Sequence, residues 1–177
     1  PNNIMALSNS GAYGFRRSLR FCLGVFFGFL IIMSACAIAG SWLFSAVPKI
    51  EPILRWAGAG YILLLAWLIY RDQGQANGPG ASGPSGILTG IMLQLVNVKV
   101  IIYGLTALSV FVLPYHDQPR VLALFVLALS LVGLAGTTAW AAFGSLIQKV
   151  FTTRRRLVNA VLAASLAACA VSTLLGA

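Results

Sequence analysis

Residues 21–44, FCLGVFFGFLIIMSACAIAGSWLF, form a stretch without a single charged side chain. The hydrocarbon core of a bilayer is about 30 Å thick, so a helix needs about 20 apolar residues to cross it. This stretch is long enough, and it predicts a transmembrane helix. The rest of the chain agrees, because 59% of the 177 residues are apolar and only 8% are charged, values far from those of a soluble domain. We therefore expect an all-α, multi-pass integral membrane protein.

Four further apolar runs are long enough to cross a bilayer. They occupy residues 53–70, 87–113, 121–147 and 157–175. The chain begins with Pro1 and shows no signal-peptide pattern, so residues 1–20 are interpreted as the end of a helix that starts upstream, followed by a loop. The sequence thus predicts a single, N-terminally truncated transmembrane domain over residues 1–177, with five full helices visible of an expected six.

The segment RDQGQANGPGASGPSG, residues 71–86, separates the second apolar run from the third. Its glycine, proline and serine content cannot bury a core and is typical of a flexible loop. This loop divides the domain into a first half, with residues 21–70 as its main part, and a second half, residues 87–177.

Basic residues set the expected orientation, because lysine and arginine accumulate in short cytoplasmic loops. Eight of them fall on one side of the predicted membrane: Arg16, Arg17, Arg20, Arg71, Lys149, Arg154, Arg155 and Arg156. Three fall on the other side: Lys49, Arg55 and Arg120. We therefore expect the loops at residues 8–20, 71–86 and 148–156 to be cytoplasmic. Topology thus explains the net charge of +9, and no nucleic acid is expected as a partner.

Gln94, Asn97 and Lys99 form the strongest polar cluster in any predicted span. A lysine near the middle of a bilayer costs at least about 2.5 to 3.5 kcal/mol. In one interpretation Lys99 snorkels to a nearby interface along its four-carbon stem. In the other it faces a polar cavity and meets an anion, such as the carboxylate of a transported molecule, or exposed backbone carbonyls. No acidic residue is expected in a visible span, because all three lie in predicted loops: Glu51, Asp72 and Asp117.

The spacing within this cluster adds a geometric condition. Asn97 and Lys99 point about 200° apart on an ideal helix, so they share a cavity only if the helix is distorted there. Pro1, Asn2 and Asn3 form a similar motif at the start of the chain. The proline removes a helix donor, and the two amides can contact a polar ligand or replace lost hydrogen bonds within a simple kink.

Polar, helix-perturbing motifs thus occur once in each half, in the first and the fourth of six predicted spans. This arrangement is typical of a transporter built as a 3+3 inverted repeat, whose substrate site lies between the repeats at mid-membrane. The candidate substrate-binding residues are Pro1, Asn2, Asn3, Gln94, Asn97 and Lys99.

Several segments resemble the lysine-exporter (LysE/RhtB) family of amino-acid efflux proteins, and the resemblance covers essentially the whole chain. PNN resembles the end of the family's N-terminal Pro-Gly-Pro motif, and GFRRS resembles the basic turn that follows. RWAGAGYILLLAW is similar to the third-helix signature, and LQLVNVKVIIYG to the fourth-helix Asn-Pro-Lys motif. Val98 stands where the family commonly has proline, which leaves open whether the helix breaks at this point.

The resemblance implies a secondary exporter of small neutral amino acids in the bacterial inner membrane, coupled to protons and working by alternating access. Within the family, the similarity of PNNIMALS and WAGAGYILLLAW implies cysteine and O-acetylserine as substrates, with homoserine, threonine or a basic amino acid as the alternative. The implied partners are the amino-acid substrate and the lipid bilayer, without a cofactor. A homodimer is one compatible assembly.

Other classes of function are disfavoured by the residues themselves. The only histidine, His116, lies with Asp117 in the expected loop LPYHDQPR, and no metal-ligand cluster, nucleophile elbow or phosphate-binding loop accompanies it. The protein is therefore not expected to be an enzyme. A membrane scaffold has no need for a mid-bilayer lysine, and a channel would conduct without saturable exchange.

Small residues in the spans are interpreted as packing positions. Cys22, Cys36 and Cys169 are widely spaced within apolar runs and lack the spacing of a zinc or redox site. The pairs Gly24/Gly28 and Gly133/Gly136 have spacings that let helix backbones approach closely.

Overall fold

The structure, a computed structural model, describes residues 1–71 and 86–175, without the side chains of residues 40–48. Every regular element in this described part of the chain is a helix. In order, the helices are α1 (Asn2–Tyr13), α2 (Phe15–Arg71), α3 (Ile87–Leu95), α4 (Val98–Phe111), α5 (Pro119–Leu146), α6 (Gln148–Thr153) and α7 (Arg155–Leu175). The prediction of an all-α membrane protein is confirmed.

The helices account for the predicted membrane spans. Four stretches have the length and apolar composition to cross a bilayer: Phe15–Ala39, Lys49–Arg71, Pro119–Leu146 and Arg155–Leu175. A fifth span is obtained when α3 and α4, which are bent by 68° at their junction, are taken together. The two last spans lie within two residues of the predicted bounds, whereas the run predicted at 87–113 forms two helices rather than one.

The connection between α1 and α2 is much shorter than expected. We predicted a loop over residues 8–20, but the only non-helical residue between the two helices is Gly14, at φ +86°. This prediction was wrong because arginine is a good helix former, so α2 already begins at Phe15, and because glycine adopts a positive φ at little cost. The Ser18 hydroxyl donates a hydrogen bond of 3.2 Å to the carbonyl of Ala6 and joins the two helices.

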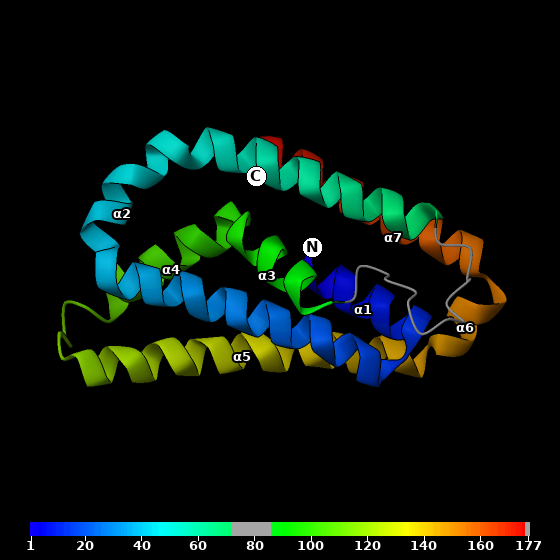
Figure 1. The fold of residues 1–177 in the computed structure, drawn as a ribbon, viewed down its shortest axis with the longest axis horizontal. Coiled ribbons are helices and arrows are strands. Elements are labelled where there is room, and N and C mark those ends of the chain that lie inside the picture. Colours follow the sequence, from blue (N-terminus) through cyan, green and yellow to red (C-terminus); the bar gives the residue numbers. More distant parts are fainter. Residues whose placement is uncertain (72–85, 176–177) are drawn as a thin grey trace.

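Helix α2 contains two spans that run in opposite directions (Figure 1). Its backbone leaves helical geometry at Ala39 (φ −119°, ψ 26°). We call Phe15–Ala39 the first arm and Lys49–Arg71 the second arm. Glu51, which we placed in a loop, lies in the second arm, where it accepts a hydrogen bond of 2.8 Å from Arg55 Nε one turn later. That prediction was wrong because the ion pair supports a further helical turn before the apolar run.

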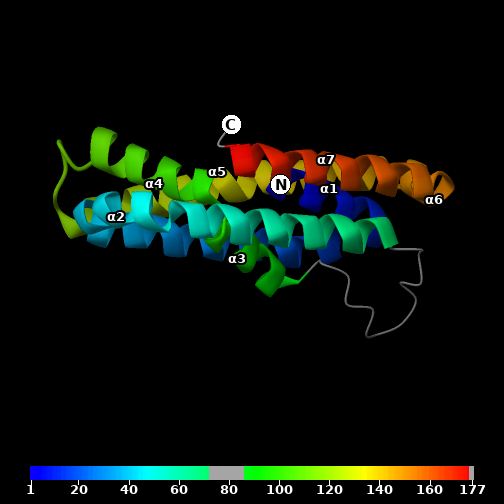
Figure 2. The same ribbon diagram turned by 90° about the horizontal axis from the view of Figure 1, so that it is seen from above.

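The helices pack as an elongated bundle, with α1 against α5, α3 and α4 against α2, and the second arm beside α7 (Figures 1 and 2). Its larger apolar cluster joins the second arm to α7 through residues such as Leu65 and Leu166. The short helix α6, which lies within the predicted loop at 148–156, packs the ring of Phe151 on Gly11 of α1. His116 and Asp117 are exposed in the turn before α5, as predicted.

Glycines permit the closest approach between helices. A Cβ on Gly90 of α3 would lie 2.5 Å from the carbonyl oxygen of Phe21 in the first arm, and Gly24 is pressed against the carbonyl of Ile87. The packing role predicted for Gly24 and Gly28 is therefore confirmed. The same prediction for the pair Gly133/Gly136 was wrong, because a Cβ on Gly133 would have its nearest neighbour at 4.0 Å and a Cβ on Gly136 would have none within 4 Å.

The cysteine thiols lie in apolar surroundings. Cys22 and Cys36 are completely buried, each in one of two apolar clusters, and Cys169 is half-buried at the edge of the larger one. All three are free thiols. The prediction that they serve as packing residues is confirmed for Cys22 and Cys36.

Candidate functional site

The junction of α3 and α4 is a broken helix in the middle of the bundle (Figure 1). Val96 (φ −92°, ψ 3°) and Asn97 (φ −88°, ψ 93°) leave helical geometry. The backbone N–H of Asn97 donates to the Gln94 carbonyl at 3.0 Å, three residues earlier rather than the four of an α-helix. Within the described residues, no backbone hydrogen bond runs from an N–H of α4 to a carbonyl of α3. The break therefore frees peptide groups at membrane depth.

The break occurs without a proline. A Cβ on Gly58 in the second arm of α2 would lie 2.5 Å from the carbonyl oxygen of Val96, so the second arm packs directly on the break. Val98, which follows the break, is 5% exposed. Close packing by a distant helix thus stabilises a bend that the local sequence does not require. Of the two alternatives left by the sequence, the distorted helix is the one observed.

Asn2 of α1 and Gln94 of α3 meet beside this break. The Asn2 Nδ2 group donates a hydrogen bond of 2.6 Å to Gln94 Oε1, across a sequence separation of 92 residues. Gln94 is only 1% exposed. A Cβ on Gly28 would lie 2.7 Å from the Cβ of Gln94, so only a glycine at that position lets α3 come this close to the first arm.

Asn2 also carries a buried acceptor. Its Oδ1 atom is buried and has no hydrogen-bond partner among the described residues. A buried polar atom without a partner is rare, because leaving it unsatisfied costs about 1–3 kcal/mol. Asn2 is hydrogen-bonded to the side chain of Gln94, which lies two residues before the break. Asn2 Oδ1 is therefore an unpaired acceptor close to the break and its freed peptide groups.

The structure does not bring all predicted site residues together. Asn3 and Lys99 are exposed, while Pro1 and Asn97 are half-buried. Lys99 lies in the first turn of α4. In the described part of the chain the one ion pair joins Arg55 to Glu51, so Lys99 has no acidic partner there. Asp72 lies outside the described residues.

Two buried hydroxyls on α5 are satisfied within their own helix. Ser130 Oγ donates to the Val126 carbonyl at 2.7 Å, and Thr137 Oγ1 donates to the Gly133 carbonyl at 2.8 Å. Each hydroxyl therefore donates its hydrogen to a carbonyl one turn earlier in the same helix, as is common in membrane helices. We therefore do not include Ser130 and Thr137 among the candidate site residues.

A sequence profile described as LysE type translocator matches residues 1–176. The chain belongs to the LysE type translocator family. Relatives of this translocator include the cysteine/O-acetylserine efflux protein of Klebsiella pneumoniae, which is 43% identical over 97% of this chain and 87% of its own length. The proteins of the same name in Salmonella typhimurium and Escherichia coli K12 are both 42% identical over the same shares. No solved structure matches the chain.

Buried polar residues that follow Asn2 on α1 of this LysE type translocator were not predicted from the sequence. Ser8, Asn9 and Ser10 are at most 4% exposed, although they fall in the segment predicted to be a loop. A helical pattern could have revealed them, because Asn2, Met5 and Asn9 are spaced three and four residues apart and share one face. In the structure that face is turned to the interior of the translocator.

Proposed function

We propose that the protein exports small neutral amino acids, with cysteine and O-acetylserine as substrates, across the bacterial inner membrane. Identities of 42–43% to curated efflux proteins with these substrates, over 97% of the chain, support the substrate class. The observation that carries the site is the partly buried hydrogen bond between Asn2 and Gln94 beside the broken helix. Discontinuous helices near the bilayer centre are a recurring way to bind polar substrates in secondary transporters.

The polar groups suit the two charges of an amino acid. The carbonyl end of α3 and the buried Asn2 Oδ1 are acceptors, so they favour the ammonium group of the substrate. The N-terminal amides of α4 are donors, and Lys99 lies in that first turn, so this side favours the carboxylate. The zwitterion would thus bridge the break with its ammonium toward α3 and its carboxylate toward α4.

The two halves are proposed to form a 3+3 inverted repeat. Under this assignment α1 and the α3–α4 pair are equivalent, as are the first arm and α5, and the second arm and α7. The packing supports the assignment, because α1 packs on α5 while α3 packs on the first arm, a reciprocal exchange. The bond from Asn2 to Gln94 then joins the two equivalent helices at the proposed axis.

Transport by the full chain in liposomes tests the proposal. With labelled O-acetylserine or cysteine, we expect saturable flux that is stimulated by an imposed proton gradient and abolished by a protonophore. Preferential flux of homoserine, threonine or lysine would move the substrate to another member of the same family. Non-saturable currents without exchange would contradict a transporter and identify a channel, and chemical conversion without net movement would identify an enzyme.

Lys99 provides a separate prediction. An exposed ammonium at this depth avoids its cost of about 2.5–3.5 kcal/mol only if water or an anion surrounds it rather than lipid. If the substrate carboxylate meets this ammonium, the Lys99→Gln variant should transport about 10-fold more slowly, because a hydrogen bond to a charged group contributes about 1.5–3 kcal/mol. Initial rates of flux in liposomes measure this change.

Arg120→Gln is the matched control, because Arg120 is an exposed cation at the start of α5, away from the break. Its rate should stay within about 2-fold of the parent. Parental flux in Lys99→Gln would remove Lys99 from the binding site and leave the assignment of Asn2 and Gln94 intact.

A further inference from the structure

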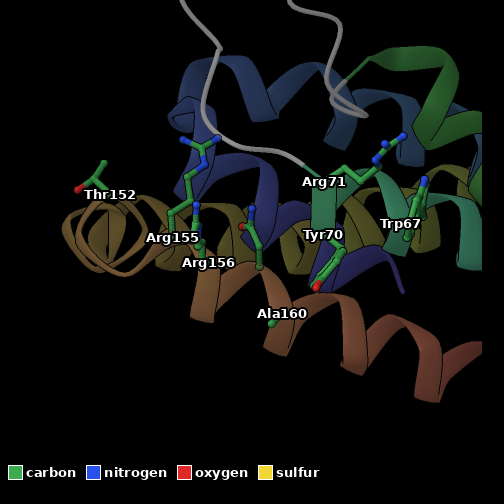
Figure 3. A pocket seen from close by; sticks show the side chains of 8 residues that line it. Trp67, Tyr70, Arg71, Thr152, Arg155, Arg156 and Ala160 are labelled. Carbon is green, nitrogen blue, oxygen red and sulfur yellow. The ribbon is translucent and has the colours of Figure 1, made fainter.

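A basic pocket opens where the end of α2 meets the start of α7 (Figure 3). Its volume is about 750 Å³, within the range of small-molecule sites. Trp67, Tyr70 and Arg71 line it from the second arm, and Arg155, Arg156 and Asn159 line it from α7. The pocket is separate from the broken helix, since none of the residues around Asn2 and Gln94 belongs to it.

The pocket carries a strong positive charge. Three of its lining residues are arginines, and none of the lining residues within 1–71 and 86–175 is acidic. Arg71 stacks on the ring of Trp67, with its guanidinium carbon 5.1 Å from the ring centroid, which fixes one of the three cations in place. The first turn of α7 has no acidic residue, so the positive end of that helix dipole adds to the charge. An anion is the complementary ligand.

The depth of the pocket points to the source of that anion. The second arm ends as a candidate span at Arg71, and α7 begins as one at Arg155. Both span ends line the pocket, so it lies at the level where lipid head groups meet the hydrocarbon core. Trp67 and Tyr70 are exposed aromatic residues at that same level, as in the aromatic belts of membrane proteins. The excess of basic residues on this side is the pattern expected of the cytoplasmic face.

We propose that this pocket binds the phosphate group of an anionic phospholipid of the cytoplasmic leaflet. Arginine is suited to this ligand because its planar fork donates two parallel hydrogen bonds to phosphate oxygens. Basic pockets between helices on the cytoplasmic side are known to hold anionic head groups in other membrane proteins. The acyl chains would follow the apolar surfaces of the second arm and α7. A bound lipid would thereby join the third helices of the two halves.

Lipid binding by the full chain in detergent tests this proposal. The probes are phosphatidylglycerol, phosphatidylcholine and inorganic phosphate, with affinity measured by native mass spectrometry and by titrated thermal stability. We expect phosphatidylglycerol to bind at least about 10-fold more tightly than phosphatidylcholine. The double variant Arg71→Gln/Arg156→Gln should lose about 25-fold in affinity for phosphatidylglycerol, at about 5-fold for each arginine.

Two further variants keep the test decisive. Arg16→Gln/Arg20→Gln removes two exposed arginines from the same predicted side but outside the pocket, and its affinity should change by less than about 2-fold. Arg71→Lys/Arg156→Lys keeps both positive charges but removes the planar guanidinium groups, so its affinity for phosphatidylglycerol should lie between those of the parent and the glutamine variant. This variant tests the pocket even if the glutamine variant does not fold. Equal losses in the pocket variant and the Arg16/Arg20 control, or tight binding of inorganic phosphate without preference among the lipids, would overturn the proposal.

Discussion

Replacing Gln94 with leucine is expected to slow export by about 10- to 100-fold while the protein still folds. Leucine has a similar volume but cannot accept the 2.6 Å hydrogen bond that Asn2 Nδ2 donates to the buried Gln94 side chain. Asn2 then loses the contact that orients it, and with it a positioned acceptor for the ammonium group, which contributes about 1.5–3 kcal/mol. The measurement is the initial rate of O-acetylserine flux in liposomes, compared at equal amounts of reconstituted protein.

Thr137→Val is the matched control for this variant. Thr137 is also a buried polar residue, but its hydroxyl bonds to the carbonyl of Gly133 in the same helix. Its replacement removes a hydrogen bond that lies within α5 and leaves the bond between Asn2 and Gln94 in place, so flux should stay within about 2-fold of the parent. Parental flux in Gln94→Leu would show that the bond to Asn2 is structural only.

Replacing Gly90 with alanine is expected to destabilise the bundle by about 2–4 kcal/mol. The added methyl group would lie 2.5 Å from the Phe21 carbonyl oxygen and 2.6 Å from the Val25 amide nitrogen. Both atoms belong to the backbone of the first arm, so neither can rotate away, and α3 must separate from α2. For a chain of this size the melting temperature in detergent should fall by about 5–15 °C.

Gly136→Ala is the control with the opposite expectation. It adds the same methyl group within a helix, but no described atom of another helix lies within 4 Å of it. Alanine favours helices by about 1 kcal/mol over glycine, so the melting temperature should stay unchanged or rise. Equal melting temperatures for the two variants would contradict the close contact of α3 with the first arm.

The membrane spans are well predicted where charge bounds an apolar run. Residues 121–147 and 157–175 were predicted, and helices Pro119–Leu146 and Arg155–Leu175 are observed, because Arg120 and the arginines at 154–156 mark the interface. The start of α2 was missed for the same reason. Its first turns contain Arg16, Arg17 and Arg20, and a hydropathy pattern cannot distinguish a basic helical turn from a loop.

The sequence predicted which residues belong to the candidate site but not how they are arranged in space. Asn2 and Gln94 were both named, but their contact depends on the approach of two helices 92 residues apart in the sequence. Lys99 was the more prominent candidate in the sequence, because a charged side chain in an apolar span is a stronger signal than an uncharged amide side chain. The broken helix could not be settled from local residues, because its bend depends on Gly58 of α2 packing on the Val96 carbonyl.

The single-residue connection at Gly14 restricts how this transporter can move. α1 and the first arm form a tight helical hairpin, because only one non-helical residue separates them and Ser18 is hydrogen-bonded to Ala6. We therefore expect Asn2 to keep its position relative to the first arm if the site opens. For the proposed site we expect opening to involve α3 and α4 instead, because Val96 and Asn97 interrupt the helix between them.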